Sequence, residues 1–170
     1  MDDDRTIQPR TTLEKLTGLA GFFIRRNILR QDLPLLASFK LTYRCNLRCA
    51  PCPYHLREDA SHATIGWEAA TAALDSLHHG GCRIVVFEGG EPLLWRDGSK
   101  TFDDIARYAR GRFLCTAATT NGTLPLDAPV DVLWVSLDGT RETHDRLRSG
   151  AFHRVWDNLG TSTHSTLLAH

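Results

Sequence analysis

Three cysteines within eight residues are the part of this sequence best suited to chemistry. Cys45, Cys49 and Cys52 follow the spacing C-x3-C-x2-C in the stretch YRCNLRCAPCPYH. Thiolates are the ligands that iron–sulfur clusters and zinc both favour. On a four-iron cluster, three cysteines would leave one iron open to a small molecule. The alternative is a zinc site completed by His55 or a distant cysteine, although the sequence has no second C-x2-C pair.

The segments around these cysteines alternate between strand and helix patterns. Residues 36–43 alternate in polarity and run directly into the cysteine loop, which is typical of a strand. Apolar, β-branched runs predict the other strands at 83–92, 113–122 and 131–139, and helical patterns occupy 66–79, 101–111 and 140–160. We therefore expect an α/β fold, with a parallel sheet covered by helices.

The chemically distinctive stretches all follow predicted strands. They are RCNLRCAPC, EGGEP, TTNGT and SLDGT, in chain order. In parallel α/β sheets the functional loops lie at the carboxyl ends of the strands. The sequence therefore predicts one site, built from these loops at a single end of the sheet.

With the cysteine loop after a first strand and GGEP after a second, the sequence resembles the radical S-adenosylmethionine (SAM) superfamily. The later TTNGT and VSLDGTRETHDRLR are similar to the third and fourth strand ends of that family. The likeness covers about residues 36 to 160. It implies a partial (β/α) barrel and an enzyme that uses a [4Fe-4S] cluster and SAM as cofactors.

The resemblance also assigns roles to individual residues. Cys45, Cys49 and Cys52 would hold the cluster, and its open iron would bind the amino and carboxylate groups of SAM. The amino group would be received by backbone carbonyls and a carboxylate in the turn Gly89, Gly90 and Glu91. Acceptors suit an ammonium group, and glycines allow close backbone approach.

Polar residues at the third and fourth strand ends complete the implied SAM site. Ser136 and Asp138 resemble family residues near the ribose, although an Asp-Gly turn with a capping role is the alternative. Thr120 and Asn121 are expected to line the same cavity, or to serve only an Asn-Gly turn. Many family members have an aromatic residue before the third cysteine, where this chain has Pro51. Tyr54 is the candidate for that adenine contact.

Several further residues have both a functional and a structural interpretation. Glu88 is expected to contact substrate or to pair with Arg83 or Arg96. The helix start at 144–148 resembles the family's HDxxR, but a surface helix with local ion pairs is the alternative. Those residues are His144, Asp145, Arg146 and Arg148. Cys82 and Cys115 are expected to be small core residues.

The chain shows fewer repeating units than the family's barrel. About four β/α units are visible, and no fifth strand is expected, so the core looks truncated at its C-terminal side. We divide the chain into an N-terminal tip and helix (1–35), a radical SAM core (36–160) and an irregular tail (161–170).

The N-terminal segment 12–30 has helical periodicity. Leu13, Leu16, Ala20, Phe23 and Ile24 recur at steps of three and four residues. One interpretation is a helix packed on the main domain. The other is a helix that lies in a membrane interface. The apolar run LTGLAGFFI is about nine residues long, too short to span a bilayer.

The composition of the chain bears on its partners and its cellular compartment. The 170 residues carry 20 basic and 20 acidic side chains, so no broad field attracts nucleic acid, and none is expected as a partner. Five cysteines, an odd number, suit a reducing compartment with a metal site better than a disulfide framework. We predict a cytoplasmic protein.

The function implied by the resemblance is reductive cleavage of SAM to a 5′-deoxyadenosyl radical that removes hydrogen from a substrate. The substrate would be a peptide or small molecule, in peptide or cofactor maturation, with a flavodoxin or ferredoxin as electron donor. The alternative is a truncated or split half-barrel without independent catalysis. It would bind an iron–sulfur cluster or a partner chain that completes the barrel.

Overall fold

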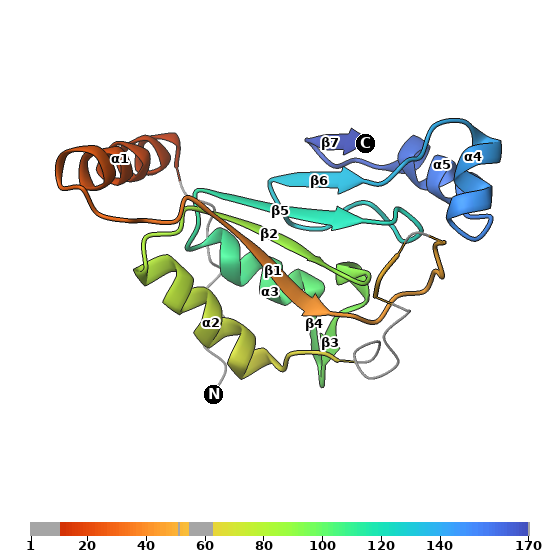
Figure 1. The fold of residues 1–170 in the computed structure, drawn as a ribbon, viewed down its shortest axis with the longest axis horizontal. Helices are drawn as coiled ribbons and strands as arrows, with labels where there is room; N and C mark the ends of the chain where they lie inside the picture. The colour runs from red at the N-terminus through yellow and green to blue at the C-terminus, as the bar shows by residue number, and fades with distance from the viewer. Residues whose placement is uncertain (1–10, 51, 55–62, 170) are drawn as a thin grey trace.

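A five-stranded parallel sheet forms the centre of the molecule, in the order β1-β2-β5-β6-β7 (Figure 1). The computed structural model describes residues 11–50, 52–54 and 63–169. The strands are β1 (Leu36–Thr42), β2 (Ile84–Gly89), β5 (Cys115–Thr120), β6 (Val132–Val135) and β7 (Leu167–Ala169). The predicted α/β class is confirmed, and the first four strands lie within the predicted ranges.

Helices α2 (Trp67–His79) and α3 (Phe102–Arg110) cover one face of this sheet (Figure 1). Both begin where a carboxylate receives a backbone N–H. Asp104 accepts from the N–H of Thr101 at 2.8 Å, and Asp97 accepts from the N–H of Trp67 at 2.6 Å. Such acceptors satisfy the unpaired donors of a helix start. Between the helices and the sheet lies a buried apolar core that includes Leu74, Phe87, Ile105 and Leu133.

Short elements complete the main body. A 3₁₀ turn η2 (Pro92–Leu94) follows β2, and the strands β3 (Arg96–Asp97) and β4 (Lys100–Thr101) form a small antiparallel hairpin that the sequence did not indicate. The predicted helical stretch 140–160 forms two helices, α4 (Arg141–Leu147) and α5 (Phe152–Thr161). Both lie near the carboxyl ends of β5 and β6 (Figure 1).

The expected irregular tail over 161–170 was wrong for residues 167–169. These residues form β7, which pairs in parallel with β6, Leu133 lying opposite Leu167. A three-residue strand has too few side chains to show a polarity period, and its backbone bonds come from a distant neighbour. The chain thus contains the start of a fifth β/α unit.

The N-terminal helix packs at the margin of this body, along one side only. It runs as α1 (Thr12–Phe23) and continues as a π-helical segment η1 (Ile24–Ile28). Its start is a capping box, in which Thr11 and Glu14 exchange backbone and side-chain hydrogen bonds. It projects beyond the amino ends of the strands, at the opposite end of the sheet from α4 and α5 (Figure 1). No helix in the described ranges is both long and apolar enough to cross a bilayer.

Candidate active site

The loops after β1, β2, β5 and β6 surround one cavity of about 290 Å³. The cysteine loop supplies one side of its wall, with Cys45, Cys49, Cys52 and Tyr54. The remaining wall comes from the ends of three strands and of α4, with Glu88, Gly89, Gly90, Thr119, Thr120, Asn121, Ser136 and Arg148. Segments about 100 residues apart in sequence therefore meet at the single site that the strand order predicted.

Backbone contacts from α4 hold the cysteine loop in place. The N–H of Ala50 donates to the carbonyl of Leu147 at 2.9 Å, and the N–H of Arg48 donates to Ser149 Oγ at 3.2 Å. Inside the loop, the N–H of Cys52 donates to the Cys49 carbonyl at 3.1 Å. The end of α4 thus determines where the second cysteine lies.

The thiol of Cys45 receives hydrogen bonds within the cavity. The Leu47 N–H donates to its sulfur at 3.4 Å, and the side-chain amide of Asn121 donates at 3.6 Å. Donors of this kind stabilise thiolates and tune the metal groups that thiolates bind. Asn121 is itself oriented by a 2.8 Å bond to Asn46, so the end of β5 is coupled to the cysteine loop.

Partial burial raises the pKa of the Cys49 thiol, while the nearby positive charge of Arg148 acts in the opposite direction. A guanidinium close to a thiol favours its thiolate form, which is the form that binds metal. Arg148 is therefore placed to stabilise negative charge in this cavity.

The glycine turn packs directly on the start of the cysteine loop. Gly89 has a φ of 128°, and a Cβ added there would lie 2.2 Å from the Thr42 carbonyl oxygen. A Cβ on Gly90 would lie 2.2 Å from the carbonyl oxygen of Arg44. The N–H groups of Gly90 and Glu91 donate to these same two carbonyls at 2.8 Å. Only glycine permits so close an approach of the two backbones.

Glu91 lies beneath the cavity rather than on its wall. Its side chain is fully buried, and its carboxylate accepts from Thr120 Oγ1 at 2.8 Å and from the Asn121 N–H at 2.7 Å. Burial raises the pKa of Glu91 to about 7. The carboxylate thus joins the glycine turn to the end of β5, and it is not part of the cavity wall.

Asp138 lies behind the cavity wall, paired with Arg148. Both of its carboxylate oxygens accept from the guanidinium of Arg148, through Nε and, at 3.4 Å, through Nη2. Arg148 lines the cavity and Asp138 does not. Ser136, Asn121 and Tyr54 do lie in the wall, and the Tyr54 ring packs on Tyr43 with centroids 5.2 Å apart. Pro51 and His55 lie outside the described residues.

The charged segment 144–148 was expected at a helix start, but it forms the second half of α4 and its C-cap, and it is more than a surface feature. His144 is fully buried, and its Nδ1 accepts from the Asp138 N–H at 3.3 Å. Arg141 and Asp145 do form a local ion pair at 3.6 Å, as the alternative expected. The HDxxR resemblance was the signal for Arg148, but the periodicity of a short helix does not reveal which of its charges turns inward.

Two further expectations need correction or refinement. Glu88 pairs with Ser38 Oγ at 2.5 Å and Lys40 at 3.8 Å, on the neighbouring strand, rather than with Arg83 or Arg96. Cys82 is buried and Cys115 half-buried, both at the amino ends of their strands, far from the cavity. Among the described residues, no three Cys, His, Asp or Glu side chains are close enough together to hold a single metal ion as they stand.

The donor set of the cavity suits an iron–sulfur cluster. Three thiols surround a space of about 290 Å³, with a cationic side chain and amide donors beside them. Thiolates are the ligands of such clusters, and hydrogen bonds to sulfur are their usual supporting contacts.

The chain is similar to several known proteins. The Radical SAM superfamily model matches residues 39–162. The Fe-coproporphyrin III synthase of Methanosarcina barkeri is 32% identical over 132 residues, covering 72% of this chain and 32% of that protein. The antilisterial bacteriocin subtilosin biosynthesis protein AlbA of Bacillus subtilis is 31% identical over 132 residues, covering 71% and 28%. The chain thus spans about a third of the length of these relatives.

The fold also resembles that of a solved structure. Native anSMEcpe with bound AdoMet superposes with a TM-score of 0.61 at 23% identity, covering 81% of this chain and 42% of that one. The superfamily uses a [4Fe-4S] cluster and SAM. On the match over residues 39–162, and on the cavity that its strand ends build, this chain belongs to the radical SAM superfamily.

Proposed function

We propose that this chain holds a [4Fe-4S] cluster on Cys45, Cys49 and Cys52 and binds SAM beside it, for reductive cleavage of SAM. The observation that carries the proposal is the single cavity lined by all three thiols, the glycine turn and Arg148. A cluster with three protein ligands keeps one iron open for the amino and carboxylate groups of SAM.

Each group of cavity residues is suited to a different part of SAM. Arg148 is a cation in the wall near Cys49 and is suited to the methionine carboxylate. The backbone of Gly89 and Gly90 is suited to the ammonium group, through its carbonyls. Asn121 and Ser136 offer hydrogen bonds to the ribose, and Tyr54 offers an aromatic face to the adenine.

Two acids outside the cavity wall, the buried Glu91 and the partly exposed Asp138, act through other residues. Asp138 orients the Arg148 guanidinium by a two-point contact, which fixes a planar group more firmly than a single bond does. Glu91 holds the glycine turn against the end of β5. We therefore assign both as positioning residues, in place of the direct SAM contacts that the resemblance implied.

When bound and reduced, the cluster would supply one electron to break the S–C5′ bond of SAM into methionine and a 5′-deoxyadenosyl radical, which would take a hydrogen atom from substrate. The donor of the electron would be a flavodoxin or ferredoxin. The names of the two relatives, one a porphyrin synthase and one a bacteriocin biosynthesis protein, support maturation of a cofactor precursor or a peptide.

A second candidate function follows from the open edge of the sheet. β7 pairs only with β6 among the described strands, and Leu168 is 47% exposed. An uncovered edge presents unpaired backbone groups to another strand. Under this second candidate function, the chain binds the cluster but needs further strands before it can turn over SAM.

Electron paramagnetic resonance tests both candidates. The chain is purified without oxygen, reconstituted with iron and sulfide, reduced, and measured with and without SAM. We expect a [4Fe-4S] signal that changes when SAM is added, followed by formation of 5′-deoxyadenosine. Cys49→Ala should abolish the signal, and Cys115→Ala should leave it unchanged.

Other outcomes have distinct meanings. A normal cluster signal that ignores SAM would favour the half-barrel candidate. Zinc at about one per chain without inorganic sulfide would exclude both.

A further inference from the structure

Exposed apolar side chains are concentrated at the end of the molecule that is farthest from the cavity. In the part of the chain that the structure describes, nine of the eleven large hydrophobic residues with exposed side chains lie between positions 13 and 36. They are Leu13, Leu16, Leu19, Phe23, Ile24, Ile28, Leu29, Leu35 and Leu36. An exposed apolar surface this concentrated marks an interaction site more often than it does an idle surface.

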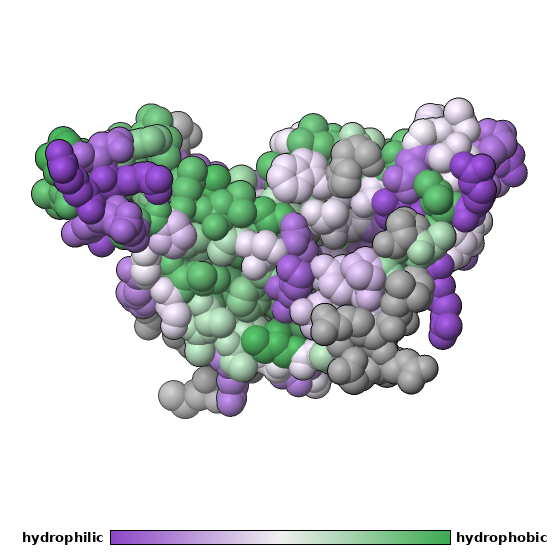
Figure 2. Space-filling view, in the orientation of Figure 1, coloured by the Kyte–Doolittle hydropathy of each residue, from purple (hydrophilic) through white to green (hydrophobic). Residues whose placement is uncertain are grey.

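The apolar stripe of α1 and η1 does not face the core, contrary to the expectation of a packed helix. Phe22 is the residue of α1 that packs inward, with 1% exposure, whereas Leu16 and Phe23 are 59% and 48% exposed. At 100° per residue, the positions 13, 16, 20, 23 and 24 fall on one side of the helix, away from position 22. Figure 2 shows hydrophobic residues along the outer edge of α1.

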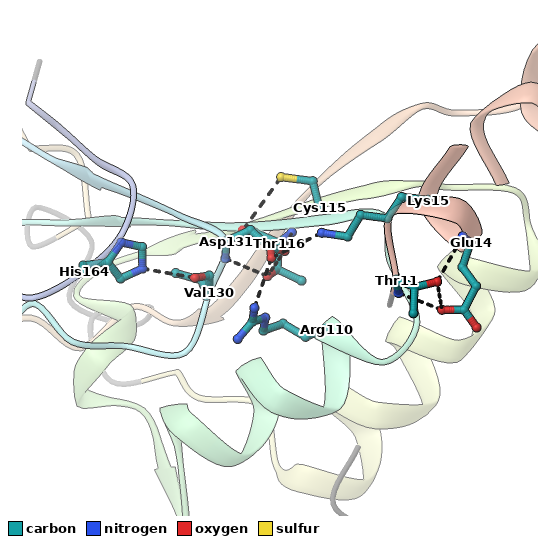
Figure 3. A network of polar contacts seen from close by, with 9 residues as sticks. All are labelled: Thr11, Glu14, Lys15, Arg110, Cys115, Thr116, Val130, Asp131 and His164. Carbon is teal, nitrogen blue, oxygen red and sulfur yellow. Dashed lines mark hydrogen bonds and ion pairs between the residues drawn. The ribbon is translucent and has the colours of Figure 1, made fainter. Parts of the chain in front are cut away.

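Among the described residues, the contacts between this helix and the body lie on its inner side. Lys15 pairs with Asp131 at 3.7 Å, and Gly18 lies against Leu114, as the network in Figure 3 shows for the ion pair. Asp131 itself belongs to the body, because it accepts from the Thr116 N–H at 2.8 Å and from Arg110 at 3.3 Å. The helix is thus fastened along its inner side, and its apolar stripe is left to the solvent.

Basic residues border the stripe. Residues 11–36 contain Lys15, Arg25, Arg26 and Arg30 but only two acids, Glu14 and Asp32, in a chain whose total charge is zero. Glu14 is engaged in the capping box with Thr11. An apolar stripe with arginines at its margin suits the boundary between acyl chains and anionic headgroups.

We infer that α1 and η1 form an interfacial helix that attaches the chain to an anionic lipid surface. The helix lies in the plane of the headgroups, with Leu16, Phe23 and Ile24 inserted and Arg25, Arg26 and Arg30 at headgroup level. A second copy of the chain is a poorer partner, since residues 11–30 offer it only the engaged Glu14 as a counter-charge. The cavity lies at the other end of the strands, so the attachment leaves it accessible (Figure 1).

Vesicle co-sedimentation tests this attachment without reference to catalysis. The whole chain is mixed with phosphatidylcholine vesicles that either contain or lack phosphatidylglycerol. We expect binding to the anionic vesicles that weakens as salt is added, and at least about tenfold weaker binding without phosphatidylglycerol. Protein with and without its cluster should bind equally, which separates this test from that of the proposed function.

Matched variants identify the surface. Leu16→Glu combined with Phe23→Glu should reduce binding at least about tenfold, because each charge must then enter the acyl boundary. Trp156→Glu is the control, since Trp156 is 58% exposed on α5 at the other end of the molecule. Arg25→Gln combined with Arg30→Gln should remove the preference for anionic lipid, and Arg154→Gln should not. Circular dichroism checks that each variant is folded.

Two results would overturn the inference. One is binding that the Leu16/Phe23 variant leaves intact. The other is no binding to either vesicle. If light scattering then shows a dimer that the same variant separates into monomers, the apolar stripe pairs with a second copy of the chain.

Discussion

The two ends of the sheet differ in how strongly they are tied together. At the carboxyl ends of the strands, backbone and side-chain bonds link the cysteine loop, the glycine turn, the end of β5 and the end of α4. At the amino ends, α1 is held by the buried Phe22, the Gly18 contact and one half-exposed ion pair.

This difference matches the two proposed tasks. A site that binds a cluster and SAM gains from side chains held in one geometry before the ligands arrive. A helix that inserts in lipid needs only an exposed apolar stripe and a firm enough attachment. A change at one end of the sheet should therefore have a different effect from a matched change at the other end or at the molecular surface.

Substitution of a glycine should show the largest contrast in stability. Gly90→Ala places a methyl group 2.2 Å and 2.5 Å from two carbonyl oxygens of the cysteine loop, so we expect a loss of about 3 kcal/mol in the free energy of unfolding. Gly21→Ala in α1 meets nothing within 4 Å and should stabilise the chain by up to about 1 kcal/mol. Denaturant unfolding measures both. Equal losses would mean that the two ends are equally packed.

The buried Glu91 should make stability depend on pH. Its pKa of about 7 is above its ordinary 4.5, so the folded chain keeps a proton that the unfolded chain releases. Stability should therefore be greatest below pH 4.5 and fall as the pH rises toward 7, by about 2 to 3 kcal/mol between pH 5 and 8. Glu91→Gln should flatten this dependence, measured by denaturant unfolding across that range.

Glu88→Gln is the control for this dependence. Glu88 precedes the same turn but is partly exposed, and it pairs with Ser38 and Lys40. Its replacement should leave the pH dependence as it was. If Glu88→Gln flattens the dependence of stability on pH and Glu91→Gln does not, the buried carboxyl of Glu91 does not cause that dependence.

Arg148 should affect SAM binding more than it affects folding. Arg148→Gln removes the cation from the cavity wall and leaves Asp138 without its two-point partner. We expect about tenfold weaker SAM affinity, which corresponds to about 1.4 kcal/mol, in a titration of the reconstituted protein. Arg154→Gln, on the exposed side of α5, should bind SAM normally. Unchanged affinity in the Arg148 variant would remove this residue from the proposed site.

The smallest effect is expected at the base of α1. Lys15→Met removes an ion pair between groups that are 39% and 20% exposed, which should cost less than about 1 kcal/mol. Hydrogen exchange should nevertheless quicken in α1 while the amides of β5 keep their protection, because the helix opens separately from the body. Faster exchange in β5 as well as in α1 would show that α1 and the sheet unfold as one unit, and unchanged exchange in α1 would show that this ion pair does not fasten the helix.

Much of the architecture could be predicted from the sequence, because local patterns report burial. The runs at 83–92 and 113–122 are apolar on both faces and became the central strands β2 and β5. The strand ends that carry the cysteines, the glycine turn, Asn121 and Ser136 were expected to meet, and they line one cavity. Parallel strands leave no other arrangement, since their carboxyl ends must share an edge.

The direction in which individual side chains turn was harder to predict. Glu91 and Asp138 are predicted SAM-site residues, and the structure shows that their carboxylates bond to Asn121 and Arg148 respectively. A sequence pattern identifies a carboxylate near a strand end. Whether that carboxylate faces a ligand or bonds to a neighbouring residue depends on hydrogen-bond donors from distant segments. The three-residue β7 could not be predicted for a similar reason, because its backbone hydrogen bonds come from β6, a distant segment.

The sequence by itself determined the cysteine spacing, the β/α alternation and the end of the sheet at which chemistry would gather. Each is a local property, or follows from the parallel order of the strands. Only the tertiary structure decided that Arg148 faces the cavity, that Glu91 lies beneath it, and that the apolar stripe of α1 is exposed. Helical periodicity shows that a stripe exists, but whether anything covers it depends on how far the helix lies from the core.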